Sequence, residues 1–389
     1  MTHYLSLKAV RERLPVDGCP ESIDELFRDT TLATPSLIMD PKEIGRNYRA
    51  LKAALPRVDI HYAIKPNNHQ VLIDEIYRLG GNYDVCSMGE INQVLKTGIN
   101  PATLIHSHPI KSRQEFDRAV AAGIETFVVD NIEEVRKFSR YTDKKLRVLI
   151  RFRIHTNTTA VVNLQYKFGC LPEDVLPLAQ QIRQSGHDFY GLCFHIGSQC
   201  IFAENYLLAI QTAHDLIHTL DLAGFDTRLL DIGGGFPVPY AEPVPPIDEF
   251  CTPINQALEN HIRPGIRIVC EPGRFIAATT TTLVTSILGK AERDGKLWYY
   301  LDDGLYSTFS GIVFDHCQYP VVTAREGDER LSVLAGPTCD SFDVMYDGLM
   351  IPEHEVGERI VFLATGAYCA VSGSNFNALK RPEYKLMEL

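Results

Sequence analysis

Short apolar runs alternate with helical patterns through the middle of the chain. Eight such runs end near Ile64, Val85, Ile105, Val129, Ile154, Phe194, Ile232 and Val269. Each of the first seven is followed by apolar residues at helical spacing, as over residues 71–79 and 206–220. Several of these helical stretches stop at a glycine, which suits a left-handed C-terminal cap, at Gly80, Gly98, Gly123 and Gly224. Eight strands alternating with helices predict an α/β fold built on a parallel (β/α)8 TIM-like barrel.

The chain on either side of this alternation has a different pattern. Residues 34–39 predict a short strand and residues 41–55 a helix. After Arg274, short strand-like segments separated by turn residues predict a C-terminal antiparallel β domain, with strands at 281–288, 297–301, 312–314, 331–334 and 359–363. Residues 1–31 lack clear periodicity, and we expect them to join that domain. The predicted division is a barrel over 32–277 and a β-sandwich or barrel-like domain from 1–31 and 278–389.

Composition narrows the class of protein. The 389 residues are 45% hydrophobic and 22% charged, which is ordinary for a globular enzyme of about two domains. The formal net charge is -11 and no Lys/Arg-rich run occurs, so nucleic acid and membrane are not expected as partners, and a small cationic substrate fits. Residues 1–5 carry no targeting pattern and no apolar run approaches 18 residues, so we expect a soluble cytoplasmic protein. Ten cysteines without a C-x-x-C pair argue against a metal site and a disulfide framework.

The C-terminal ends of barrel strands are where active sites are built. Titratable residues and glycines gather at the predicted strand ends. In chain order they are Lys65; Asp84, Cys86 and Glu90; His106; Arg151 and Arg153; His195 and Ser198; Gly233, Gly234 and Gly235; and Glu271 and Arg274. Alone, Lys65 would be an ordinary loop lysine and His195 a satisfied core histidine. Their shared position predicts one site at one rim of the barrel.

Two of these strand ends predict a phosphate site. Glycines 233–235 allow backbone N–H groups to approach an anion, although a tight turn explains them equally well. Arg274 follows the eighth strand, beside those glycines in a barrel, although an ion pair with Glu271 is the alternative. Together with the strand-end Lys65, a phosphate site predicts pyridoxal 5'-phosphate, which needs a Schiff-base lysine and a group facing its ring nitrogen. Glu271 would be that group, and His195 would stack on the ring.

The β domain contributes further candidates. Cys339 and Asp340 lie in a turn at 336–341, and Asp315 lies upstream. A thiol beside a carboxylate can donate a proton, and two aspartates can hold a substrate ammonium. In isolation these would be ordinary turn residues.

Six motifs, in order, resemble the fold-type III pyridoxal-phosphate decarboxylases of basic amino acids, and among them the ornithine decarboxylases. They are YAIKPN at 62–67, HIGS at 195–198, LDIGGGFP at 230–237, EPGR at 271–274, GPTCDS at 336–341 and GAY at 366–368. The resemblance covers nearly the whole chain from Thr34. It implies an alanine racemase-like fold, a barrel that carries the cofactor and a β domain beside it.

The resemblance also implies roles for the matched barrel residues. Lys65 would form the Schiff base with the cofactor, Glu271 would pair with its ring nitrogen and His195 would stack on its ring. The remaining cofactor contacts would come from Asp84, Glu90, Arg153, Ser198, Gly234, Gly235, Gly273, Arg274 and Tyr368. Arg151 is the alternative to Arg153.

A homodimer with active sites at the interface is implied as well. Cys339 would protonate the substrate carbon after CO₂ leaves, and with Asp340 it would reach the partner subunit's cofactor. Asp315 and Asp340 would hold the distal ammonium, with Phe376 near the site. The expected reaction is decarboxylation of L-ornithine to putrescine, as in polyamine biosynthesis.

Other substrates and other classes of protein compete with this reading. Lysine, or an ornithine-containing siderophore precursor, would suit the same residues, and three departures from the family pattern keep the substrate open, namely Pro66, Phe314 and the pair Gln199 and Cys200. A non-catalytic regulatory homologue has no need for Lys65, Glu271, Arg274 and Cys339 together. A racemase typically avoids a carboxylate at the ring nitrogen, so Glu271 favours decarboxylation.

Overall fold

The chain forms two compact units in a computed structural model that describes residues 4–6, 20–154, 166–240 and 242–387. Residues 45–237 and 244–276 make up the barrel unit. Residues 1–44, 238–243 and 277–389 make up the sheet unit. The domain limits at 32 and 277 stay a prediction, and residues 7–19 of the predicted N-terminal segment lie outside the described part.

The barrel unit is a closed barrel of parallel strands, as predicted. Its strands are β3 (Val58–Ala63), β4 (Asn82–Val85), β5 (Ile105–His106), β6 (Thr126–Val129), β7 (Arg147–Arg151), β8 (Asp188–Cys193), β9 (Leu229–Asp231) and β10 (Arg267–Cys270), and β10 pairs with β3 to close the ring. Apolar side chains from six strands fill its interior, namely Ile105, Val128, Leu149, Cys193, Leu229 and Val269. Gly191 is required where β8 meets β9, because a Cβ there would lie 1.9 Å from the Leu229 carbonyl oxygen.

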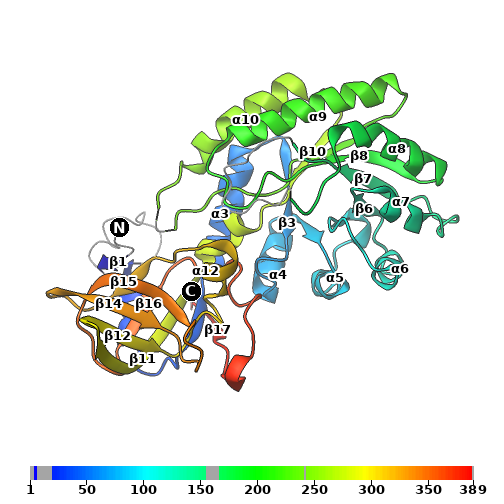
Figure 1. Ribbon diagram of the computed structural model, residues 1–389. Helices are drawn as coiled ribbons and strands as arrows, with labels where there is room; N and C mark the ends of the chain where they lie inside the picture. Colours follow the sequence, from blue (N-terminus) through cyan, green and yellow to red (C-terminus); the bar gives the residue numbers. More distant parts are fainter. Residues whose placement is uncertain (1–3, 7–19, 155–165, 241, 388–389) are drawn as a thin grey trace. The chain divides into compact units, whose positions relative to one another are not determined.

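Helices surround these strands (Figure 1). They are α3 (Pro41–Ala54), α4 (Gln70–Arg78), α5 (Met88–Leu95), α6 (Arg113–Ala121), α7 (Ile132–Phe138), α8 (Val175–Gln184), α9 (Glu204–Leu222), α10 (Ile247–His261) and α11 (Arg274–Ala277), with short 3₁₀ turns η1 (Pro101–Thr103) and η2 (Pro172–Asp174). Ser87, Ser112 and Asn131 cap α5, α6 and α7 by accepting from the backbone N–H three residues on. The four glycines expected to end helices all have positive φ, as a left-handed cap requires. Within the described residues, no helix is long and apolar enough to cross a membrane.

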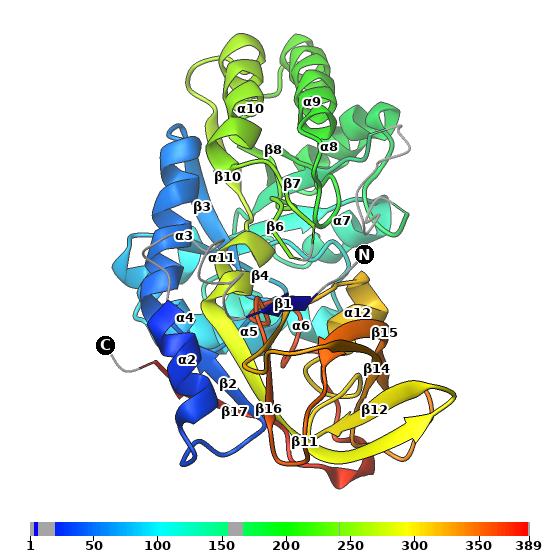
Figure 2. The same cartoon turned by 90° about the vertical axis from the view of Figure 1, so that its left-hand side faces the viewer.

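The sheet unit is built on one mixed sheet. Its strands are β1 (Tyr4–Ser6), β2 (Ser36–Met39), β11 (Thr281–Arg293), β12 (Lys296–Leu301), β13 (Val321–Thr323), β14 (Glu329–Ala335), β15 (Val344–Pro352), β16 (Arg359–Phe362) and β17 (Glu383–Leu386). Most described pairings are antiparallel, and β1–β13, β12–β14 and β17–β2 are parallel. The unit also holds α2 (Pro20–Arg28), α12 (Ser310–Asp315), η3 (Ala278–Thr280) and η4 (Phe376–Ala378). Figure 2 shows its long strands β11, β12, β14 and β15 together.

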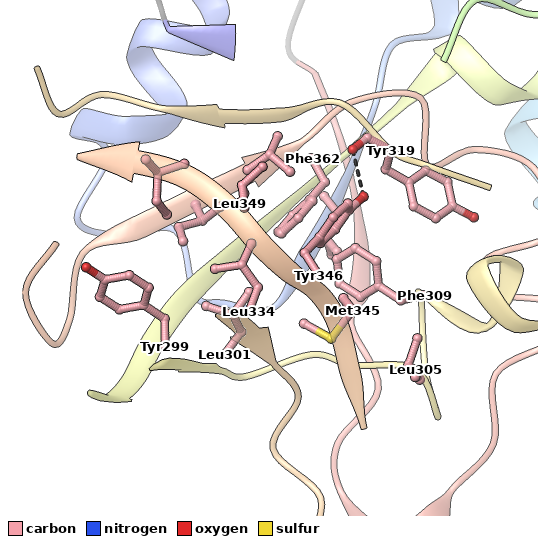
Figure 3. Close-up of a cluster of buried hydrophobic side chains, with 14 of the residues drawn as sticks. Tyr299, Leu301, Leu305, Phe309, Tyr319, Leu334, Met345, Tyr346, Leu349 and Phe362 are labelled. Carbon is pink, nitrogen blue, oxygen red and sulfur yellow. Dashed lines mark hydrogen bonds between the residues drawn. The ribbon is translucent and has the colours of Figure 1, made fainter. Parts of the chain in front are cut away.

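Buried aromatic and aliphatic side chains hold this sheet together. Tyr319, Tyr346, Phe309 and Phe362 pack in one cluster, and the Tyr346 hydroxyl donates to the Tyr319 carbonyl oxygen at 2.7 Å (Figure 3). Burial of these rings, together with the aliphatic side chains of the same cluster, stabilises the sheet unit.

The strand predicted at 312–314 is wrong, because these residues lie in α12. Its first residues, Ser310 and Gly311, are buried, whereas Phe314 is 68% exposed, so the apolar run does not enter a sheet. A Cβ on Gly311 would lie 2.2 Å from the Tyr319 hydroxyl oxygen, which explains the glycine at this close contact.

Candidate active site

Lys65 lies two residues beyond β3, at the C-terminal rim of the barrel. Its Nζ is 3.0 Å from Oδ2 of Asp84, which follows on the neighbouring strand β4. Asp84 is 1% exposed, and its Oδ1 has no hydrogen-bond partner among the described residues. A buried carboxylate oxygen normally accepts a hydrogen bond, so a bound molecule with an N–H or O–H group could donate to Asp84 Oδ1.

The turn that carries Lys65 is fixed by close packing. Pro66 lies against Gly273, where a Cβ would be 2.4 Å from the Pro66 Cγ. The Ala63 N–H donates to the Pro272 carbonyl, and the Tyr62 hydroxyl donates to the Asn67 carbonyl. The proline that departs from the family pattern is therefore accommodated by a glycine of EPGR.

Three further carboxyl groups of the barrel are hard to ionise. Burial raises the pKa of Glu90 to about 7, and its Oε2 accepts from the Cys86 N–H at 2.6 Å. Burial also raises the pKa of Glu271 well above its usual value, and the nearby Asp231 adds to the rise. Asp231, fully buried at the end of β9, has its pKa raised to about 7, chiefly by burial. Two carboxyl groups close together in low dielectric favour the protonated form until a cation or N–H donor faces them.

His195 follows β8 and presents a neutral ring. Although part of the side chain is accessible, burial lowers its pKa well below 6.5, and Arg151 and Lys65 lower it further. Its Nδ1 accepts from the Gly197 N–H at 3.0 Å. A neutral imidazole can stack on an aromatic ring without adding charge. Because Arg151 lowers the pKa of His195, its guanidinium lies near the imidazole. For Arg153, the backbone N–H donates to the Cys170 carbonyl oxygen at 3.0 Å.

The three glycines form a close-packed backbone cradle. A Cβ on Gly234 would lie 2.4 Å from the Glu271 carbonyl oxygen, and one on Gly235 would lie 2.2 Å from the Gly197 carbonyl oxygen. The Tyr206 hydroxyl donates to the Gly234 carbonyl oxygen at 2.9 Å and so fixes the backbone of this turn. No side chain fits at Gly234 or Gly235, so an anion can approach the backbone there. The Gly233 N–H donates instead to Asp231 Oδ1 at 2.8 Å.

Arg274 and Ser198 lie together in the same unit. Arg274 is 4% exposed, and its guanidinium donates to the Ser198 hydroxyl from Nε at 3.2 Å and from Nη2 at 3.0 Å. Arg274 and Glu271 follow the same strand, β10. A buried guanidinium beside a hydroxyl and a glycine cradle suits a phosphate.

The sheet unit holds the remaining predicted residues. Cys339 is exposed, and both its N–H and its Sγ donate to Asn377 Oδ1, at 3.1 and 3.3 Å. Asp340 accepts from the Phe342 N–H at 3.0 Å and from the hydroxyl of Tyr306.

Tyr306 also links Asp340 to the C-terminal segment of the sheet unit. Its ring stacks on Phe376 with centroids 4.4 Å apart. Asp315 ends α12, and Tyr368 lies in a turn with φ of 57°. Cys339, Asp340 and Phe376 are therefore brought together through Tyr306 and η4.

Sequence reasoning missed Asp231 and Tyr306. Asp231 is an ionisable residue inside a buried apolar strand, and that position alone was a usable signal. Tyr306 carried no such signal, since its partners come from a loop more than thirty residues away. Among the described residues, no group of three or more His, Cys, Asp or Glu side chains could hold a metal ion.

The barrel residues fit pyridoxal phosphate. Asp84 Oδ1, which has no hydrogen-bond partner among the described residues, can accept from a cofactor N–H or O–H group. The buried carboxyl groups of Glu271 and Asp231, whose pKa values are raised by burial, would ionise when a protonated ring nitrogen faces them. Arg274, Ser198 and the glycine cradle fit its phosphate, and Lys65 is the amine that its aldehyde requires.

Comparisons with known proteins agree with this geometry. A family model described as the pyridoxal binding domain of pyridoxal-dependent decarboxylases matches residues 41–278. The lysine/ornithine decarboxylase of Selenomonas ruminantium is 32% identical over 347 residues, which are 89% of this chain and 88% of that protein.

Solved structures are similar over almost the full chain. The lysine/ornithine decarboxylase of Vibrio vulnificus, complexed with cadaverine, is 38% identical with a TM-score of 0.88, covering 94% of this chain and 98% of that one. The arginine decarboxylase of Paramecium bursaria Chlorella virus, bound to agmatine, is 27% identical with a TM-score of 0.87, covering 94% and 99%. The chain belongs to the pyridoxal-dependent decarboxylase family, and pyridoxal phosphate is its cofactor.

Proposed function

We propose that the chain decarboxylates L-ornithine and releases putrescine and CO₂. The observation that carries this proposal is the carboxylate of Asp340 in the turn beside Cys339. The hydroxyl of Tyr306, followed by the N–H of Phe342, lowers the pKa of Asp340, so this group is ionised at neutral pH. An ionised carboxylate is the group that the distal ammonium of a diamino acid requires. Asp315 would be the second.

The barrel residues are proposed to bind and orient the cofactor. Lys65 would be joined to its aldehyde carbon, and Glu271, backed by Asp231, would hold a proton at its ring nitrogen. His195 would cover one ring face. The proposed phosphate and side contacts are Asp84, Glu90, Ser198, Gly234, Gly235, Gly273, Arg274, Tyr368 and either Arg151 or Arg153. Of the two arginines, Arg151 is favoured by its effect on the pKa of His195.

The chemistry then depends on where protons are held. The bound cofactor supplies an electron sink for the pair left when CO₂ departs. Glu271 would favour this as a carboxylate, because an ionised carboxyl group facing the ring nitrogen keeps that nitrogen protonated. Its raised pKa belongs to the site without that positive partner. Cys339 is proposed to deliver a proton to the substrate carbon, since its thiol is exposed and hydrogen-bonded rather than buried. Phe376 would border the substrate chain.

We also propose a homodimer in which Cys339 and Asp340 serve the partner subunit's cofactor. The sheet unit exposes two large apolar side chains, Phe342, which is two residues after Asp340 and 60% exposed, and Phe314, which precedes Asp315 and is 68% exposed. Both line one hollow, together with Val313. Clustered exposed apolar residues mark an interface more often than a free surface.

Lysine is the second candidate substrate. It is one methylene longer than ornithine, and the similar Vibrio vulnificus structures hold cadaverine in one case and putrescine in the other. A methylene in an apolar channel is worth only about 1–3 kcal/mol of discrimination, so both substrates can be used.

A substrate panel tests the proposal. The protein reconstituted with pyridoxal phosphate is assayed for CO₂ release from L-ornithine, L-lysine and L-arginine, and kcat/KM is compared. We expect the highest kcat/KM for ornithine. A higher kcat/KM for lysine or arginine would reassign the substrate, and CO₂ release from none of them would refute the proposal in favour of a non-catalytic homologue.

A further inference from the structure

A buried carboxylate lies at the base of the turn that carries Cys339 and Asp340. Asp343 is 2% exposed. Its oxygens accept from the Leu305 N–H at 2.7 Å, the Thr338 N–H at 3.1 Å and the Thr338 hydroxyl at 2.7 Å. One side chain therefore ties together two loops, residues 302–308 and residues 336–342.

Two glycines make room for this carboxylate. A Cβ on Gly304 would lie 2.4 Å from an Asp343 oxygen, and a Cβ on Gly336 would lie 2.3 Å from one. Neither glycine has a positive φ, so an L side chain is compatible with both backbones. The lack of a side chain at these two positions is explained by the close approach of Asp343.

The two loops joined by Asp343 carry the groups proposed to act on the substrate. Tyr306 lies on the first loop, and its hydroxyl donates to Asp340 on the second. Cys339 on the second loop is tied to Asn377. The backbone N–H of Asp343 also donates to the Asp340 carbonyl at 3.1 Å. A displacement of the Asp343 side chain would therefore move both Cys339 and Asp340.

A carboxylate suits this position better than an amide. Three donors converge on its two oxygens, and a carboxylate accepts at both. An asparagine would turn an NH₂ group toward the Leu305 or the Thr338 N–H, which leaves a buried donor without an acceptor.

We propose that Asp343 is a positioning residue that fixes the two loops presenting Cys339 and Asp340 to the substrate. This inference rests on the proposed function. Asp343 contacts neither substrate nor cofactor in this proposal. A misplacement of about 1 Å in reacting groups can lower a rate by about a hundredfold, so small loop shifts are measurable.

A double-mutant cycle tests the proposal in the full-length, cofactor-loaded protein. Gly336→Ala and Asp343→Ala are each expected to lower kcat for ornithine by about ten- to a hundredfold. The double variant is expected to be no slower than Asp343→Ala alone, because the carboxylate that the added methyl group displaces is gone. The cofactor absorbance band is expected to stay unchanged in all three, since its proposed ligands other than Tyr368 lie in the barrel unit.

A second measurement is independent of turnover. The rate at which iodoacetamide alkylates Cys339, followed by mass spectrometry without substrate, is expected to rise at least threefold in Gly336→Ala and Asp343→Ala. Gly289→Ala is the matched control, because its Cβ would lie at an ordinary 3.6 Å from Tyr300 in the same unit. It is expected to leave both kcat and alkylation unchanged.

Three results would overturn the proposal. They are multiplicative losses in the double variant, a kcat and alkylation rate of Asp343→Ala within twofold of wild type, or the same alkylation change in Gly289→Ala. If Asp343→Ala does not fold, Thr338→Val replaces it and removes one donor, with an expected alkylation change of at least twofold; an unchanged rate counts against the proposal. If the wild-type protein decarboxylates no amino acid, the proposed function fails, while the alkylation cycle still decides whether Asp343 positions the loop.

Discussion

Asp231 is expected to make the cofactor-free barrel less stable at high pH. Burial raises the pKa of its carboxyl from 3.8 to about 7, which corresponds to on the order of 4 kcal/mol. Because the folded protein binds this proton more tightly than the unfolded chain, the contribution to unfolding free energy is fully present below pH 3.8. It is lost as the pH rises through 7.

Asp231→Asn removes this titration. From pH 5 to pH 8, the wild-type cofactor-free protein is expected to lose about 2–3 kcal/mol through Asp231 alone. The variant should lose correspondingly less, and a smaller dependence should remain because Glu271 still titrates. At pH 8 the cofactor-free variant should therefore be more stable than wild type.

Urea unfolding at pH 5 and pH 8 measures the effect. Far-ultraviolet circular dichroism is a suitable signal, because most of the described helices belong to the barrel unit. Asp226→Asn is the matched control, since that side chain is 70% exposed. Equal pH dependence in wild type and Asp231→Asn would refute the reasoning, as would an equal change in the control.

Three other predictions follow from single contacts. Cys339→Ala should lower amine formation at least tenfold while the cofactor absorbance band is kept, and mixing it with Lys65→Ala should restore partial activity if the sites are shared in a dimer; an unchanged rate would remove Cys339 from the chemistry. Gly191→Ala should destabilise the barrel by about 3 kcal/mol or more, as measured by urea unfolding, because its methyl would collide with the Leu229 carbonyl, whereas Gly89→Ala has ordinary space and should not destabilise. Tyr346→Phe should lower stability by about 1 kcal/mol through loss of the hydrogen bond to Tyr319, and an unchanged melting temperature would contradict that value.

The barrel was predictable because its signals are local. Strand β6 is buried throughout, and β10 is buried after its first residue. Several of the helices between strands end at a glycine with positive φ, and the glycine itself can be read from the sequence. The sheet unit was less predictable. Its strand β17 is largely exposed and pairs with β2 across most of the chain, so neither periodicity nor spacing identifies it. The run at 312–314 failed because three apolar residues do not distinguish a strand from a helix.

The candidate site divides in the same way. Lys65, His195, Glu271 and Arg274 were predicted as site residues because each stands at a strand end beside a motif. Their positions in one barrel unit agree with that reasoning, and their individual roles stay a prediction. Asp343 was missed because its burial depends on close packing. Its carboxylate fits only because Gly304 and Gly336 carry no side chain, and Gly304 lies more than thirty residues before it in the chain. Such contacts exist only once the chain has folded.

One measurement tests the central claim most directly. Purified protein with pyridoxal phosphate and L-ornithine is followed for CO₂ and putrescine, with Lys65→Ala in parallel. We expect equimolar CO₂ and putrescine from wild type, a loss of turnover by at least a thousandfold in Lys65→Ala, and loss of the absorbance band of the lysine-bound cofactor. Absence of CO₂ from the wild-type protein, or equal turnover by Lys65→Ala, would contradict the account.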